Sequence, residues 1–188
     1  KPLLEILKKY GIEGPANPEL SPKYKWTEAS DLTLCGKLMT DTPNPYHRVD
    51  TVQYKGFTTK ENFQVRMSSG ISVAFKTNST SIRVLTEYGQ ASFPTNGNGY
   101  STRGYDLYIK KEGQWVYAES GVANDLNKRF TLINNMDNSE KECLLYLPLY
   151  SEVKSVKIGT DKDATIEALP NPFRHRIGIF GSSYTHGS

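Results

Sequence analysis

The stretch of sequence that best defines the fold is residues 105–117, which read YDLYIKKEGQWVY. Two short runs rich in aromatic and branched residues lie on either side of Lys111-Glu112-Gly113. Alternating side chains of these types are typical of β-strands, and a short connection containing glycine is typical of a tight hairpin. This segment therefore predicts two neighbouring antiparallel strands.

The same pattern extends in both directions, from Trp26 to about Glu167, with clusters of Gly, Pro, Asn, Asp and Ser between the runs. Many short strands with almost no helix favour an all-β fold, specifically a jelly-roll-like antiparallel β-sandwich, over a parallel sheet. The predicted strands are Leu32–Leu38, His47–Tyr54, Phe63–Arg66, Ile71–Lys76, Ser81–Thr86, Tyr105–Lys111, Gln114–Ser120, Lys128–Leu132, Glu142–Leu147, Val153–Ile158 and Thr165–Ala168.

The two ends of the chain depart from this pattern. Residues Pro2–Tyr10 have apolar side chains at helical spacing and are followed by Gly11, which predicts a short amphipathic helix. Near the other end, two prolines in Pro170–Pro172 precede a continuous apolar run, Ile177–Phe180, which is typical of a strand buried on both faces of an α/β sheet. We therefore expect a helix and linker over 1–25, a sandwich domain over 26–170, and the start of a second, truncated domain over 171–188.

Composition excludes several classes of protein. The 188 residues are 37% hydrophobic and 23% charged, as in ordinary globular proteins, and the net charge is only +3. The charges alternate in sign, so no basic stripe favours nucleic acid as a partner, and no apolar run is long enough to span a membrane. No signal-peptide pattern follows Lys1, so we expect any such segment to have been removed. Cys35 and Cys143 could form a disulfide or remain two buried thiols.

The C-terminal stretch Gly181–Gly187 carries the clearest chemical signal. A buried strand that enters a turn of small residues can expose a serine hydroxyl and leave backbone N–H groups free for a developing oxyanion. The sequence GSSYTHG resembles the first block of the SGNH (GDSL-like) hydrolases, usually written Gly-Asp-Ser-x-Thr-x-Gly. The resemblance implies that Ser183 is the nucleophile and that its N–H is one oxyanion donor. Ser182 stands where the common pattern has Asp.

A second stretch supports this resemblance. Residues 104–108, GYDLY, resemble the Gly-x-Asp-Leu-Tyr signature of the β-sandwich that precedes the catalytic domain in one group of these esterases, many of them from gut Bacteroidetes. Residues 144–150 and 153–159 resemble the closing strands of that module. The resemblance implies a serine carbohydrate esterase, without cofactor or metal, that is exported to the periplasm or the exterior, with a lipoprotein as one form of this expectation.

The resemblance also implies a partner domain. The acid and base of these hydrolases form an Asp-x-x-His motif, which does not occur in this chain. A serine without an imidazole partner is a weak nucleophile, so we expect these residues alone to hydrolyse nothing and to act with their own C-terminal catalytic domain on an acylated carbohydrate. His175 and His186 are poorly placed to substitute as the base, because one begins the apolar strand and the other follows Ser183 by three residues.

An alternative is a binding or scaffolding module without catalysis. The long segment between Tyr88 and Tyr100 mixes aromatic and amide side chains, and Tyr88, Phe93 and Tyr100 could stack on sugars or cover the catalytic domain. His47 could neighbour an active site or simply begin a strand.

The acidic residues of the predicted turns favour structural roles. Asp106, at the start of a strand, more often anchors a backbone or a turn than a ligand. The acidic residues at 137–140 and 161–163 are typical of solvated turns, because they lack the glycine and terminal glutamate of a calcium loop.

Overall fold

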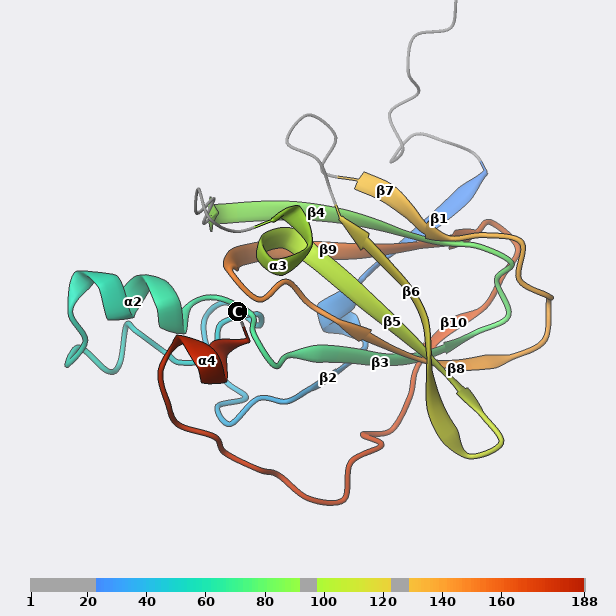
Figure 1. The fold of residues 1–188 in the computed structure, drawn as a ribbon. Coiled ribbons are helices and arrows are strands. Elements are labelled where there is room, and N and C mark those ends of the chain that lie inside the picture. The colour runs from blue at the N-terminus through green and yellow to red at the C-terminus, as the bar shows by residue number, and fades with distance from the viewer. Residues whose placement is uncertain (1–22, 92–97, 123–128, 188) are drawn as a thin grey trace, which may run out of the picture.

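A computed structural model describes residues 23–91, 98–122 and 129–187 (Figure 1). They form two antiparallel sheets packed face to face, which confirms the predicted all-β sandwich. The helix expected over residues 2–10 lies outside the described residues. The strands are β1 (Tyr24–Glu28), β2 (Thr33–Cys35), β3 (Ser72–Thr77), β4 (Ile82–Ala91), β5 (Gly104–Lys111), β6 (Gln114–Val122), β7 (Arg129–Ile133), β8 (Lys141–Tyr146), β9 (Ser151–Asp161) and β10 (Ile166–Ala168). The helices are the 3-10 turn η2 (Ala29–Asp31), α2 (Thr59–Val65), α3 (Gly99–Arg103) and α4 (Ser183–His186).

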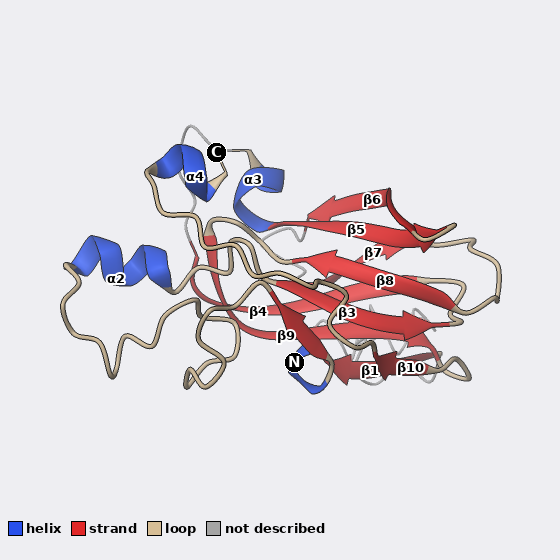
Figure 2. Ribbon diagram, turned by 90° about the horizontal axis from the view of Figure 1, so that it is seen from below, coloured by secondary structure: helices blue, strands red, loops and turns tan. Residues whose placement is uncertain are grey.

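The two sheets have different strand orders. One sheet runs β1-β9-β4-β7, and the other runs β10-β3-β8-β5-β6 with β2 also paired to β3. The strand β9 is the longest and pairs with both β1 and β4. Figure 2 shows that α2, α3 and α4 all lie at one end of the sandwich. None of the helices in the described ranges has the length and apolar character needed to cross a membrane.

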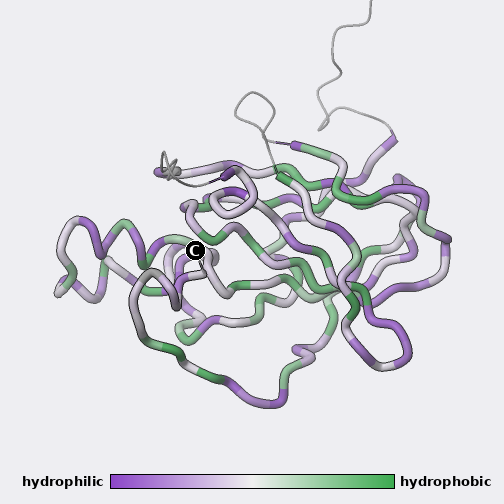
Figure 3. The backbone as a smooth tube through the Cα atoms, in the orientation of Figure 1, coloured by the Kyte–Doolittle hydropathy of each residue, from purple (hydrophilic) through white to green (hydrophobic). Residues whose placement is uncertain are grey.

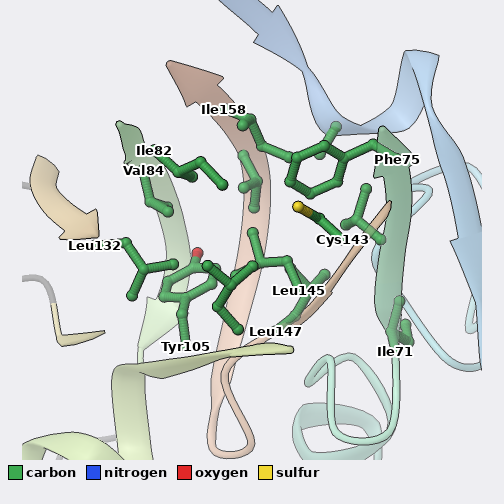
Figure 4. Close-up of a cluster of buried hydrophobic side chains, with 14 of the residues drawn as sticks. Ile71, Phe75, Ile82, Val84, Tyr105, Leu132, Cys143, Leu145, Leu147 and Ile158 are labelled. Atoms are coloured by element: carbon green, nitrogen blue, oxygen red, sulfur yellow. The ribbon is translucent and has the colours of Figure 1, made fainter. Parts of the chain in front are cut away.

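The core lies between the sheets, where strand side chains alternate inward and outward. In β3, Val73 and Phe75 point into the core, and in β5, Tyr105, Leu107 and Ile109 do so. Figure 4 shows the ring of Tyr105 among branched side chains from both sheets. The Tyr105 hydroxyl lies 2.6 Å from the Thr86 hydroxyl on β4, so this one side chain connects the two sheets by a hydrogen bond.

Two predicted strands between β2 and β3 were wrong. Residues 47–54 form turns, because the Asp50 side chain accepts hydrogen bonds from the N–H groups of Val52 and Gln53, and Val52 is 68% exposed. Residues 63–65 belong to α2 and Arg66 is its C-cap. A capping box between Thr58 and Glu61 begins α2, and this Thr-x-x-Glu pattern was a helix signal present in the sequence.

Two further differences concern the ends of the described chain. Strand β1 was not predicted, although Tyr24 and Trp26 alternate with polar residues, and it pairs with β9. The predicted strand Ile177–Phe180 is not formed: it has no strand neighbour among the described residues, and the Phe180 side chain is 90% exposed. In Figure 3 this run is an apolar stretch within the loop that leads to α4.

The two cysteines are separate, buried thiols. Cys143 points into the main core, whereas Cys35 packs with Ala74 and Leu144 in a second cluster. Burial raises the pKa of the Cys143 thiol to about 12 and also raises that of Cys35. Of the two possibilities left open by the sequence, the structure therefore has the free thiols.

Candidate functional site

The stretch that resembles the hydrolase block forms a short helical turn. Ser183 begins α4, and the N–H groups of Thr185 and His186 donate hydrogen bonds to the Ser182 carbonyl, at 3.0 and 3.3 Å. Gly181 has no room for a side chain, because a Cβ there would collide with the Thr185 hydroxyl. The Gly and Thr of the block thus fit against each other and shape the turn that carries Ser183.

Helix α4 is attached to the sandwich mainly through His186. The Nε2 atom of His186 lies 2.7 Å from the Leu149 carbonyl oxygen, and its ring stacks on Tyr150 with centroids 4.1 Å apart and planes at 10°. The Ser69 hydroxyl donates to the His186 carbonyl at 2.8 Å. These contacts hold the turn carrying Ser183 against the segment between β8 and β9.

These contacts also bear on the two histidines considered as substitute bases. The His186 ring is occupied by the Leu149 carbonyl and by Tyr150. Burial lowers the pKa of His186, the Leu149 hydrogen bond raises it, and the charge of Arg48 lowers it again, so the ring is neutral at pH 7. His175 lies in an exposed, irregular segment.

A buried carboxylate lies on the strand that follows this attachment point. Glu152, at the start of β9, is 7% exposed, and its Oε2 accepts a hydrogen bond from the Gln90 N–H at 2.8 Å. Its Oε1 lies 2.9 Å from His47 Nε2 and 3.6 Å from Arg66 Nη1. We call these four residues the Glu152 cluster. These residues lie up to about one hundred positions apart in the sequence, so no local motif could have revealed the cluster.

The pKa of His47 follows from this environment. Burial lowers the pKa of His47, the carboxylate of Glu152 raises it, and the charges of Arg66 and Lys37 lower it. The net direction is downward, so His47 is neutral at pH 7 and Glu152 carries the charge that balances Arg66. His47 lies in an irregular segment and does not begin a strand.

Arg48 connects α2 to the attachment point of α4. Its Nε donates to the Met67 carbonyl at 3.0 Å and its Nη2 donates to the Gln64 carbonyl at 2.5 Å, so it neutralises the C-terminal end of α2. Its charge also acts on Tyr150 and His186. Helices α2 and α4 are therefore parts of one end of the molecule, as Figures 1 and 2 both show.

The predicted sugar-stacking residues fall in three different settings. Tyr88 lies on β4 and packs against the main core, whereas Tyr100 lies on α3 and is 57% exposed. Phe93 lies outside the described residues. Of the two described aromatics, Tyr88 is therefore part of the core packing and only Tyr100 is largely exposed.

The signature GYDLY has a structural explanation at each position. Gly104 lies directly against the Tyr100 carbonyl, where a Cβ would collide, and it ends α3 as β5 begins. Tyr105 and Leu107 point into the core, while Tyr108 packs edge-on against Tyr146 on the outer face. The exposed carboxylate of Asp106 accepts a hydrogen bond from the Ser120 hydroxyl on the neighbouring strand β6. The signature therefore specifies the α3–β5 junction and the contact between the sheets.

The other acidic turns are also held by hydrogen bonds. Asp137 accepts from the N–H of Ser139 and from the Lys141 ammonium, and Asp161 accepts from Thr80 and Ser81. Within residues 23–91, 98–122 and 129–187, no group of three or more His, Cys, Asp or Glu side chains is arranged to hold a metal ion.

Fold and sequence together define a class of domain: an antiparallel β-sandwich that carries the GYDLY signature at the α3–β5 junction. The sequence profile of the GxDLY family, the N-terminus of SGNH-hydrolase-type esterases, matches residues 24–166. The chain belongs to this family. No curated protein matches the sequence.

Solved structures agree with this assignment. A candidate GDSL-like lipase from Bacteroides ovatus ATCC 8483 is 36% identical, with a TM-score of 0.83 over 88% of this chain and 49% of that one. The salicylyl-acyltransferase SsfX3 of a tetracycline biosynthetic pathway shares the fold, with 16% identity and a TM-score of 0.58 over 79% of this chain and 42% of that one. The chain thus spans about half the length of the solved relatives it matches.

Proposed function

We propose that this chain is the front part of a serine carbohydrate esterase that removes acyl groups, in particular acetyl groups, through an acyl-Ser183 intermediate. The observation that carries the proposal is the Gly181–Gly187 block, which begins α4 and is attached to the family's sandwich through His186. Residues 171–188 would then begin the catalytic domain, and the sandwich would act as its scaffold.

The chemistry needs groups from two parts of the protein. Ser183 would attack the ester carbonyl, and its backbone N–H would donate to the oxyanion. The proton of the hydroxyl would pass to a histidine held by an aspartate, and both would come from the Asp-x-x-His motif of the catalytic domain. The chain contains no such motif, so residues 1–188 alone would be inactive.

A carbohydrate substrate is supported by the groove beside α2, which offers hydroxyl, amide and cationic groups beside an aromatic ring. Export to the periplasm or to the exterior is part of the proposal and would give the enzyme access to polysaccharides. The alternative, a carbohydrate-binding or scaffolding module without catalysis, would keep the same surface but would not need Ser183.

Acetate release tests the proposal. The protein carrying its catalytic domain should release acetate from acetylated xylo-oligosaccharides, whereas Ser183→Ala should lose at least about 10³-fold in rate. Ser182→Ala is the matched control and should retain activity, and residues 1–188 alone should release none. Unchanged acetate release by Ser183→Ala would contradict the proposal.

A further inference from the structure

A groove lies beside α2 at this end of the molecule. It is an open groove of about 500 Å³, and its walls come from α2, from a preceding turn and from the end of β4. In Figures 1 and 2, α2 projects from the same end of the sandwich that carries α4. The lining residues are Thr51, Thr59, Lys60, Asn62, Phe63, Arg66 and Gln90.

Several polar groups in this groove have no partner within the described residues. The Lys60 ammonium makes no ion pair or hydrogen bond there, and neither do the hydroxyls of Thr51 and Thr59. Phe63, one helical turn from Lys60 and Thr59, is partly exposed. An aromatic ring surrounded by uncommitted donors is the arrangement that binds a sugar ring, with its apolar face on the aromatic group and its hydroxyls on the polar groups.

The Glu152 cluster fixes the other wall. Arg66 Nε donates to the Asn62 carbonyl at 3.1 Å, and its Nη2 donates to Gln90 Oε1 at 3.3 Å, so the guanidinium has a set orientation while its side chain is 30% exposed. Glu152 holds Gln90 and Arg66 from behind and does not line the groove. This wall is therefore ordered before any ligand binds.

The charged side chains that line the groove are all positive. Lys60 and Arg66 are cationic, and no carboxylate lines the groove. Glu152 balances Arg66, which leaves the charge of Lys60 uncompensated. A ligand that combines a sugar ring with a carboxylate would satisfy both the aromatic group and the cations, because guanidinium and ammonium groups form strong charge-assisted hydrogen bonds with carboxylates.

We propose that this groove binds a uronic acid unit of the polysaccharide substrate, with Phe63 under the sugar ring and Lys60 and Arg66 on the carboxylate. The inference rests on the proposed function, since it names the substrate class of the same enzyme. It adds a specificity site on the sandwich, away from the reacting ester.

Binding by the 188-residue chain itself tests the inference. Titration with tetragalacturonate, followed by ¹⁵N–¹H NMR, should shift the amides of Thr59, Lys60, Phe63 and Gln90, with a Kd of about 0.1–1 mM. Cellotetraose, a neutral chain of the same length, should bind at least about fivefold more weakly, because it lacks the carboxylates. Poly-glutamate should not shift these amides.

Variants separate the contributions of charge and ring. Lys60→Ala should weaken tetragalacturonate binding about five- to tenfold and leave cellotetraose binding nearly unchanged, while Phe63→Ala should weaken both. Lys111→Ala, at the exposed β5–β6 hairpin, is the matched control and should bind as the wild type does. The dispersion of each NMR spectrum establishes that the variant is folded.

The inference would be overturned by no shifts with tetragalacturonate, by equal affinity for cellotetraose, or by full affinity in Lys60→Ala. Shifts of the same amides by poly-glutamate would identify a general polyanion site and would overturn it as well. Because these titrations involve no ester hydrolysis, they are independent of Ser183: a chain carrying Ser183→Ala should bind tetragalacturonate normally even if acetate release fails.

Discussion

Two carboxylates at opposite ends of β9 differ in their partners. Glu152 begins the strand and meets a histidine, an arginine and the Gln90 N–H. Asp161 ends the strand and accepts only from neutral groups, the Thr80 N–H at 2.8 Å, the Thr80 hydroxyl at 2.7 Å and the Ser81 hydroxyl at 2.8 Å.

The difference shows that the Asp161 end of β9 is structural, whereas the Glu152 end is a candidate functional site. At Asp161, hydrogen bonds from the hydroxyls of Thr80 and Ser81 close a turn and leave no group free to bind a ligand. At the other end, Glu152 orders Arg66 and Gln90, whose outer sides face the groove beside α2. Charged groups that are paired, partly buried and next to an opening are typical of functional sites.

Glu152→Ala should lower the free energy of unfolding by about 2–3 kcal/mol, because it leaves the Gln90 N–H without its acceptor and Arg66 without its ion-pair partner in a largely buried place. Urea unfolding at pH 7 measures the change. Glu167→Ala removes an exposed partner of Lys76 and should leave the midpoint of urea unfolding nearly unchanged. Equal effects of the two substitutions would show that the burial and pairing of Glu152 do not stabilise the fold.

Asp161→Asn should cost about 1–2 kcal/mol at pH 7 and should depend on pH. Burial raises the pKa of Asp161, but hydrogen bonds from Thr80 and Ser81 lower it to about 2. A lowered carboxyl pKa stabilises the folded state above its ordinary value near 3.8, and this stabilisation is lost as the pH falls toward 2.

Urea unfolding of the wild type and the Asp161→Asn variant should therefore converge between about pH 4 and pH 2. Asp163→Asn, in the same turn but exposed, is the control and should follow the wild type. A difference that stays constant down to pH 2 would show that the Asp161 charge is not what the hydroxyls stabilise.

His186→Ala should have a smaller, local effect of about 1 kcal/mol, because it removes one hydrogen bond and one ring stack. Hydrogen exchange of the Thr185 and His186 amides should accelerate about fivefold, while the core strands stay protected. His175→Ala is the exposed control. Since burial lowers the pKa of His186, the wild-type attachment should also weaken as the pH falls below about 6.5. Exchange rates insensitive to the substitution would mean that other contacts hold α4.

The sequence was sufficient to predict the sandwich because its strands carry their own pattern. Tyr105 and Leu107 alternate with polar residues, and the alternation follows burial in the core. The same rule failed at Val52 and Tyr54, which alternate but lie in exposed turns, because periodicity alone does not reveal whether a face has a partner. At Ile177–Phe180 the pattern indicates a buried strand, yet no neighbouring strand is present in the described chain.

Only part of the candidate site could likewise be predicted from the sequence. Ser183 could be predicted, because its block is contiguous in sequence. The Glu152 cluster could not, because β9, β4, α2 and the turn before it contribute one residue each, and only the folded sheet brings them together. The role of His186 in attaching α4 also depends on Leu149 and Tyr150, more than thirty residues away in sequence.

The identity of the nucleophile is the claim on which this account most depends, and intact-protein mass spectrometry with a fluorophosphonate probe tests it most directly. The protein carrying its catalytic domain should gain one probe adduct, which Ser183→Ala should abolish and Ser182→Ala should retain, while residues 1–188 alone should remain unlabelled. Persistent labelling of Ser183→Ala, or no labelling of any form, would contradict the account.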